Sequence, residues 1–237
     1  MLELLGQQIV PIYNYRIVLQ YADEFSRGIG NTLSAAAASL VLSIAFGFLL
    51  ALIRLSGRSW LTYPAAAYTH SIRATPLLLQ IYIVYFGLPL LIPATGRWSE
   101  VVLGVIALTL HTTPYMAEII RSGIVSVPRG QREGAIAVGM TPIQQYRHII
   151  LPQAFTNTLP PLLGQSAILV KDTSLLSLIT VFDLVSAGML LNSERIRPNE
   201  GFLSVAVIYL AIYCVMLMLS RVAEHYLAGT SRKARTA

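Results

Sequence analysis

Long apolar runs alternate with short polar segments along this chain, and the runs are long enough to form membrane-spanning helices. A helix needs about 18 to 20 mostly apolar residues to cross the hydrocarbon core of a bilayer. Lys171 and Asp172 interrupt one run, whereas the first and last runs carry no charge. The pattern predicts an all-α integral membrane protein with five transmembrane helices. These lie at residues 33–53, 65–91, 101–120, within 159–190, and at 202–219.

The composition agrees with this reading, since 55% of the residues are hydrophobic and 12% are charged, against about 25% charged in soluble domains. Five spans in 237 residues leave no room for a separate soluble domain. We expect a transmembrane domain at residues 28–226 and a cytoplasmic tail at 227–237. Residues 1–27 carry Glu3 instead of a basic region, so we expect a short surface helix there and not a cleavable signal peptide.

Three local features refine the predicted spans. Asn31 or Thr32 has the side chain of a helix N-cap and would start the first span. Pro76 lacks a backbone N–H and would kink the second. Glu118 and Arg121 lie one turn apart, so they can form an ion pair on one face of the third. Residues 35–38 are all alanine, which lets a neighbouring helix approach closely.

The basic residues behind the net charge of +6 lie in particular segments between the predicted spans. A nucleic-acid-binding patch would cluster its basic residues, but here the excess falls on the segments after the first, third and fifth spans. Basic loops face the cytoplasm, so we expect the N-terminus outside, the C-terminus in the cytoplasm and no nucleic-acid partner. The residues that carry this signal are Arg54, Arg58, Arg121, Arg129, Arg132, Arg147, Arg221, Arg232, Lys233 and Arg235.

The polar segment at residues 122–153 has too few contiguous apolar positions to span a membrane and lies on the same predicted cytoplasmic side. Pro128 precedes a stretch of about two helical turns at residues 131–138. Gly139 then permits a sharp turn, and Pro142 can begin the next helix. We predict a short helix across the cytoplasmic face, rigid enough to transmit force; the alternative is an ordinary amphipathic linker.

The spacing inside this segment resembles the "EAA" loop of bacterial ABC importer permeases. Glu133-Gly134-Ala135 is followed by Gly139 and then by Ile149-x-Leu151-Pro152. The surroundings resemble the permeases of polar amino-acid importers, the histidine, glutamate, glutamine, arginine and opine group. The further landmarks are Arg73-Ala-Thr-Pro-Leu-Leu, Tyr85-Phe-Gly-Leu-Pro89, Tyr115-Met-Ala-Glu-Ile-Ile-Arg-Ser-Gly123, Leu159-Pro-Pro and Lys171-Asp-Thr-Ser-Leu175.

The resemblance implies a type I importer fold in which the short helix couples to a cytoplasmic ATPase. One position departs from the family, because Gly134 stands where the motif has alanine. Glycine in a helix interior costs about 1 kcal/mol relative to alanine, so we expect a less rigid coupling helix with its role retained. The residues implied in coupling are Arg129, Gly130, Gln131, Glu133, Gly134, Ala135, Gly139 and Met140.

The fourth span carries the most plausible substrate contacts. Gln165 and Asp172 lie two turns apart and therefore on one face, and interrupted spans are a recurrent substrate site in transporters. Asp172 could accept an ammonium group, and amides or hydroxyls could bind a carboxylate. Alternatively, Lys171 and Asp172 neutralise other protein charges or mark an outer gate, and Arg73 snorkels near the cytoplasmic end of its span. The candidates for the pathway are Gln165, Asp172, Thr173, Ser174, Arg73 and Thr75.

The implied function is that of the transmembrane subunit of an ATP-driven importer in a bacterial inner membrane, in contact with lipid. The chain has no Gly-rich phosphate loop, so ATP and Mg²⁺ would bind to a partner ATPase dimer, with no cofactor or metal on this chain and no enzymatic activity. A second permease subunit, identical or similar, and an extracytoplasmic binding protein complete the implied assembly. The alternative is an ion-gradient-driven secondary transporter or channel, for which His111, Glu118 and Asp172 are the candidate coupling groups.

Overall fold

The computed structural model describes the backbone of residues 13–233 and the side chains of residues 13–222; the first part of the expected surface segment, residues 1–12, lies outside this range. All regular structure in the described part is helical, which confirms the predicted all-α class. The long elements are α2 (Ala22–Leu55), α3 (Ser59–Ala74), α6 (Glu100–Val125), α9 (Leu151–Asp172) and α11 (Pro198–Lys233). The short ones are α1 (Tyr15–Leu19), α4 (Leu77–Tyr82), η2 (Ile83–Gly87), α5 (Leu88–Leu91), η3 (Pro93–Arg97), α7 (Arg129–Ala137), α8 (Pro142–Gln145), η4 (Tyr146–Ile150), η5 (Thr173–Ile179) and α10 (Leu184–Arg195).

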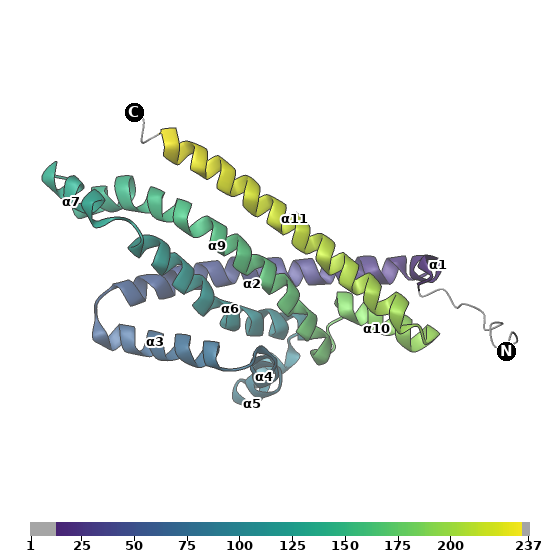
Figure 1. Cartoon of the computed structure of the whole chain (residues 1–237). Helices are drawn as coiled ribbons and strands as arrows, with labels where there is room; N and C mark the ends of the chain where they lie inside the picture. The colour runs from purple at the N-terminus through teal and green to yellow at the C-terminus, as the bar shows by residue number, and fades with distance from the viewer. Residues whose placement is uncertain (1–12, 234–237) are drawn as a thin grey trace, which may run out of the picture.

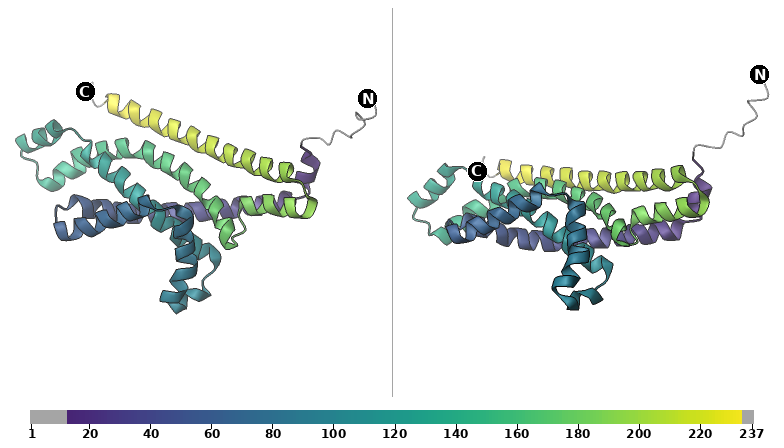
Figure 2. Two further views of the ribbon diagram at one scale, coloured as in Figure 1. Left: turned by 60° about the horizontal axis from the view of Figure 1, so that its bottom comes forward. Right: turned by 90° about the horizontal axis from the view of Figure 1, so that it is seen from below.

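The long helices run along the length of the molecule, with α7 at one end and α10 towards the other (Figure 1). Four segments are long and apolar enough to cross a membrane. A fifth crossing comes from α3 and residues 77–91 if these two arms form one span, and they meet at an angle of 112°. The kink predicted at Pro76 is thus a sharp bend. In both views of Figure 2 the teal segment after this bend projects away from the long helices.

The first span begins earlier than predicted. The α2 helix starts at Ala22, so Asn31 and Thr32 lie in its interior and the expected N-cap there is wrong. Both side chains instead hold a distant segment: the Asn31 amide donates to the Phe182 carbonyl at 2.7 Å, and the Thr32 hydroxyl accepts from the Leu184 N–H at 3.1 Å. The boundary expected between residues 27 and 28 therefore falls within one continuous helix.

The α2 and α6 helices pack through small side chains, as the alanine-rich stretch predicted. Ala35 and Ala36 are buried, and the stripe of small residues continues towards the other end of α2. An added Cβ at Gly47 would lie 2.7 Å from the Met116 Cβ and 3.0 Å from the Ala117 nitrogen, so the two backbones are in close approach there. The remaining buried members of this stripe are Ser39, Ser43 and Ala51.

Replacing Gly47 with alanine should therefore separate α2 from α6, at a cost of about 1–3 kcal/mol as for other overpacked sites. The measurement is the unfolding midpoint of the purified chain in detergent. Gly30 is a matched control on the same helix, because a Cβ there would meet no atom within 4 Å among the described residues. A Gly47→Ala midpoint equal to that of Gly30→Ala would contradict the close approach.

The fourth span also differs from its prediction. The helical segment that contains it is continuous over Pro142–Ile179, and Lys171 and Asp172 mark a change from α to 3₁₀ geometry, not a gap. Thr180 ends the segment with a left-handed φ of 67°. Residues 184–190, expected in the same span, belong to the separate helix α10, which packs against α2 and α11.

Asp183 caps this second helix. Its carboxylate accepts from the backbone N–H and the hydroxyl of Ser186 at 2.8 and 2.9 Å. The side chain is buried, and this burial raises its pKa, although the bonds from Ser186 act in the opposite direction. The cap therefore begins α10 directly beside α2.

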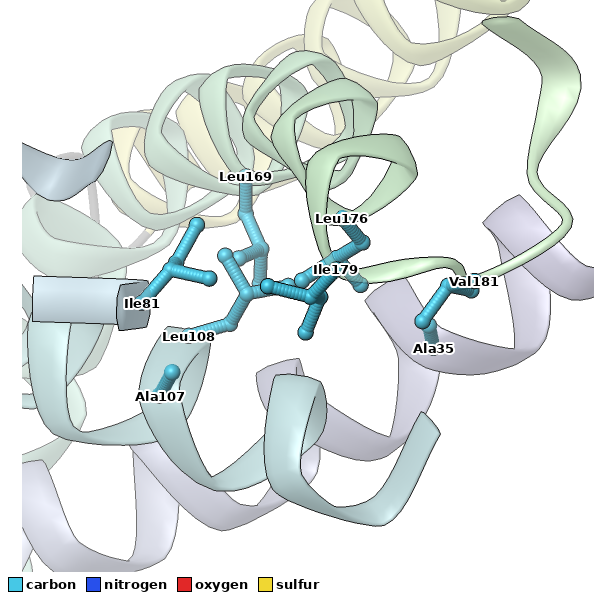
Figure 3. Packing of buried hydrophobic residues seen from close by; sticks show 8 residues of the cluster. All are labelled: Ala35, Ile81, Ala107, Leu108, Leu169, Leu176, Ile179 and Val181. Carbon is cyan, nitrogen blue, oxygen red and sulfur yellow. The ribbon is translucent and has the colours of Figure 1, made fainter. Parts of the chain in front are cut away.

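The main apolar core lies where the bent span and the end of α9 meet α2 and α6. Figure 3 shows its side chains converging from these elements. This core fixes the relative positions of the bend in span two and of η5, the two regions that carry the predicted substrate residues. Its buried members are Ala35, Ile81, Ala107, Leu108, Leu169, Leu176, Ile179 and Val181.

Candidate functional site

The predicted short helix at residues 131–138 forms as α7 and is followed by the predicted turn. Gly139 has a φ of +77°, a left-handed conformation that favours glycine. Thr141 then caps α8: its hydroxyl accepts from the Gln144 N–H, and the Gln144 side chain accepts from the Thr141 N–H. Pro142 occupies the first turn of α8, as expected. Both ends of the turn are thereby fixed.

The α7 helix packs against α8 and η4 at one end of the molecule (Figure 1). Ala135 is buried in this contact at 5% exposure. The Met140 N–H donates to the Ala135 carbonyl at 3.0 Å, and the Gln145 side chain donates to the Met140 carbonyl at 2.8 Å. These bonds join α7, the turn and α8 into one unit, and α8 is continuous with the start of the fourth span.

Three large apolar side chains of this unit are exposed. Ile136, Val138 and Ile143 are 57%, 74% and 79% exposed, and we call these three residues the α7–α8 apolar patch. Such exposed patches mark sites of protein contact. The predicted coupling residues Arg129, Gly130, Gln131, Glu133 and Gly134 are exposed beside it, whereas Met140 is half-buried.

Gly134 leaves room for the alanine that the motif would have, because a Cβ there would meet no atom within 4 Å in the described part of the chain. Gly134→Ala should stabilise α7 by about 1 kcal/mol, which slows amide hydrogen exchange across residues 131–137 about fivefold. Gly130→Ala is a matched control nearer the helix start, where the helical preference matters less. Unchanged exchange in Gly134→Ala would show that α7 is already fully formed.

The bend in the second span carries two of the predicted pathway residues. Arg73 and Thr75 are exposed at the end of α3 away from Arg54 and Arg58, and the alternative that Arg73 snorkels near the cytoplasmic end of its span stays a prediction. The Arg73 guanidinium lies over the Tyr115 ring of α6, 5.4 Å from its centroid.

Sequence reasoning missed Gln80, which is 8% exposed and joins the bend to α6. Its amide nitrogen lies 2.8 Å from the Ile72 carbonyl and 3.0 Å from the Thr75 carbonyl, and its oxygen lies 2.9 Å from Nδ1 of His111. The available signal was a glutamine one turn after Pro76, inside an otherwise uncharged apolar run.

The predicted pathway residues of the fourth span differ in how deeply their side chains are buried. Gln165 and Asp172 are half-buried on one face of α9, and Ser174 is half-buried in η5. Thr173 is 0% exposed, and its hydroxyl donates to the Val170 carbonyl at 2.7 Å, so it has no surface to offer a ligand. Lys171 is exposed, and its ammonium lies 5.1 Å from the Tyr213 ring centroid. Because α4 packs against η5, the bend and the end of α9 are neighbours.

Glu118 forms the predicted pair with Arg121 at 2.5 Å and a second pair with Arg54 of α2, also at 2.5 Å. Both carboxylate oxygens are engaged by guanidinium groups, which disfavours a cation or a transferable proton at this position. Beside Glu118, α6 and α9 line an open pocket of about 520 Å³. It is lined by Glu118, Ile119, Ser122, Gly123, Ser126, Asn157 and Pro161.

Residues 25–228 match the family described as binding-protein-dependent transport system inner membrane component. The chain belongs to this family. It is 40% identical over 216 residues to the octopine transport system permease protein OccM of Rhizobium meliloti, covering 88% of this chain and 87% of that protein. It is 34% identical over 210 residues to the probable amino-acid ABC transporter permease protein PatM of Vibrio harveyi, covering 89% and 93%.

Among solved structures, the chain is similar to an amino acid ABC transporter crystallised with histidines. The TM-score is 0.83 at 30% identity, over 90% of this chain and 98% of that one. These likenesses confirm the predicted type I permease fold and the function of an ABC importer's transmembrane subunit, a multi-pass inner-membrane protein. They do not favour the alternative of a stand-alone secondary transporter or channel.

Proposed function

We propose that this chain imports an amino acid or amino-acid derivative, driven by a separate ATPase that docks on the α7–α8 apolar patch. The observation that carries the proposal is the continuity of Pro142–Ile179. Its first turns pack against α7, and its far end carries Asp172 and Ser174. A displacement of α7 by the ATPase is therefore delivered along one helical segment to the predicted substrate region.

The substrate meets side chains from two elements in this proposal. Arg73 at the bend offers a guanidinium to the carboxylate, since arginine binds carboxylates in a bidentate manner. Thr75 is exposed beside it, and its hydroxyl would exchange its present bond to the Ser71 carbonyl for one to the substrate. Gln165 and Asp172 of α9 offer an amide and a carboxylate to the ammonium group. Movement of α9 against the bend then changes the distance between the two halves of the site, which is what alternating access requires.

The family of this chain supports an assembly with partner proteins. A second permease subunit, identical or similar, completes the pathway, and two ATPase subunits bind from the cytoplasm, the side that the basic residues Arg129, Arg132 and Arg147 favour for the coupling loop. An extracytoplasmic binding protein delivers the substrate to the opposite side. The N-terminus is then outside and the C-terminus cytoplasmic. ATP and Mg²⁺ are held by the ATPase.

Reconstitution tests the proposal directly. The complete transporter is placed in proteoliposomes with internal ATP, and uptake of labelled octopine, L-arginine, L-glutamine and L-histidine is measured with and without a sodium or proton gradient. We expect uptake of at least one of these compounds that requires both the ATPase and ATP and is insensitive to the gradients. Gradient-driven uptake without the ATPase would refute the proposal.

A further inference from the structure

The bend in the second span leaves backbone groups that a membrane cannot satisfy. Thr75 and Pro76 have extended conformations, and Pro76 has no N–H to donate. Carbonyls freed in this way are costly inside a bilayer unless protein groups bind them. The Gln80 amide does so, since its nitrogen shares its two hydrogens among the Ile72 carbonyl, the Thr75 carbonyl and the Thr75 hydroxyl, at 2.8, 3.0 and 2.8 Å.

The oxygen of the same side chain binds α6. It lies 2.9 Å from Nδ1 of His111, which is 8% exposed. Because an amide oxygen only accepts, His111 carries its hydrogen on Nδ1. One glutamine thus connects both sides of the bend to the third span, and its removal would leave the Ile72 and Thr75 carbonyls and the His111 ring without their present partner.

The contact continues through α6 back to the substrate region. The His111 ring lies 5.2 Å from the Tyr115 ring, and the Arg73 guanidinium lies 5.4 Å from the same Tyr115 ring. Contacts therefore lead from Gln80 through His111 and Tyr115 to Arg73. Gln80 also bonds the carbonyl of Ile72, the residue that precedes Arg73. A change at Gln80 would alter the angle of the bend and with it the place of Arg73.

We propose that Gln80 is a positioning residue, and that its bond to His111 acts as a latch that holds the bend so that Arg73 and Thr75 can meet the amino acid. What is positioned rests on the proposed function above. The latch itself rests on the hydrogen bonds alone, so the two can be tested separately.

The latch is tested by measuring the bend without any substrate. Spin labels are attached to Tyr63→Cys on α3 and Leu90→Cys on α5, which are 76% and 83% exposed, in a Cys214→Ser background that removes the chain's one cysteine. Pulsed electron–electron double resonance on the assembled transporter in nanodiscs gives the distance between the two labels. We expect one narrow distribution for the parent and a broadened or shifted one for Gln80→Leu and for His111→Leu.

A matched control excludes a general loss of stability. Thr69→Val on α3 removes a different buried hydrogen bond, from the Thr69 hydroxyl to the Ala65 carbonyl at 2.8 Å, in a side chain that is 1% exposed. Its distance distribution should equal that of the parent. A distribution in both latch variants that matches Thr69→Val would overturn the proposal, and His111→Leu decides it if Gln80→Leu does not assemble.

Uptake shows whether the latch serves the substrate. With the compound that the wild type transports, Gln80→Leu and His111→Leu should each raise the half-saturating concentration about tenfold, a loss typical of a buried hydrogen bond to a positioning group. The double variant should be no worse than Gln80→Leu, because Gln80→Leu already removes the bond to His111. Additive effects would show independent roles. Absence of uptake by the wild type would count against the proposed function and leave the distance measurement to judge the latch.

Discussion

Replacing Ile143 with aspartate is expected to abolish ATP-driven uptake while the membrane spans stay folded. Ile143 is the most exposed residue of the α7–α8 apolar patch, at 79%, and a charge there would have to be buried against the docked ATPase. Loss of one such contact costs about 2 kcal/mol or more, about 30-fold in affinity. The measurements are co-purification of the ATPase with the permease and ATP hydrolysis stimulated by the loaded binding protein.

Two variants separate a lost contact from a lost helix. Ile143→Leu keeps an apolar side chain and should retain coupled hydrolysis. Thr141→Ala removes the capping box of α8, at a cost of about 1 kcal/mol, but leaves the patch in place and should lower transport only slightly. If Thr141→Ala were as defective as Ile143→Asp, the order of the loop and not the apolar contact would explain the result.

A substitution of Glu133 is a second test of ATPase docking on the same surface. It is exposed on α7 next to Gly134 and forms no ion pair within the described residues, so its charge is available to a partner. Glu133→Lys should weaken ATPase docking while membrane insertion is unchanged. Arg132→Glu is a matched charge reversal on the neighbouring position. Normal transport by Glu133→Lys would remove this residue from the coupling surface.

The apolar periodicity and the Gly and Pro positions were sufficient to predict the class of the fold and the turn between α7 and α8. Long uncharged runs have few structural solutions in a membrane, and Gly139 and Pro142 act locally, through backbone geometry that does not depend on distant contacts. The turn and the start of α8 therefore occur at the residues that the pattern indicated.

The misplaced helix N-cap has a clear physical cause, which is that distant partners bind the side chains involved. Asn31 and Thr32 have the side chains of helix caps, but their hydrogen bonds go to Phe182 and Leu184, about 150 positions further along the chain. Arg54 similarly pairs with Glu118 across two helices. Neither contact is visible from local spacing.

The latch and the buried hydroxyl illustrate the same limit at the candidate site. Gln80 stands in an apolar run with no neighbouring motif, and only the bend of 112° brings it against Ile72, Thr75 and His111. Thr173 looks equivalent to Ser174 in the sequence, yet the change to 3₁₀ geometry buries its side chain completely and leaves Ser174 half-buried. The residue types were enough to locate the polar region, but the backbone geometry determines which of its side chains are accessible to a substrate.

Asp172→Asn is expected to raise the half-saturating substrate concentration at least about tenfold, with little change in assembly. The substitution keeps the shape of the side chain but removes the charge that would accept the substrate's ammonium group, and a hydrogen bond to a charged group contributes about 1.5–3 kcal/mol. Asp172 is half-buried near the end of α9, where water competes less for it than at a loop. The measurement is uptake in proteoliposomes across a range of substrate concentrations.

The neighbouring lysine distinguishes substrate binding from charge balance. Lys171 is exposed and lies over the Tyr213 ring of α11, which is not part of the proposed substrate site, so Lys171→Gln should transport almost normally. If Asp172 served only to neutralise Lys171, the double variant Lys171→Gln with Asp172→Asn would recover the wild-type concentration dependence. If Asp172 binds the ammonium group, the double variant keeps the full defect of Asp172→Asn, because the lost partner is the substrate and removal of a second protein charge cannot replace it.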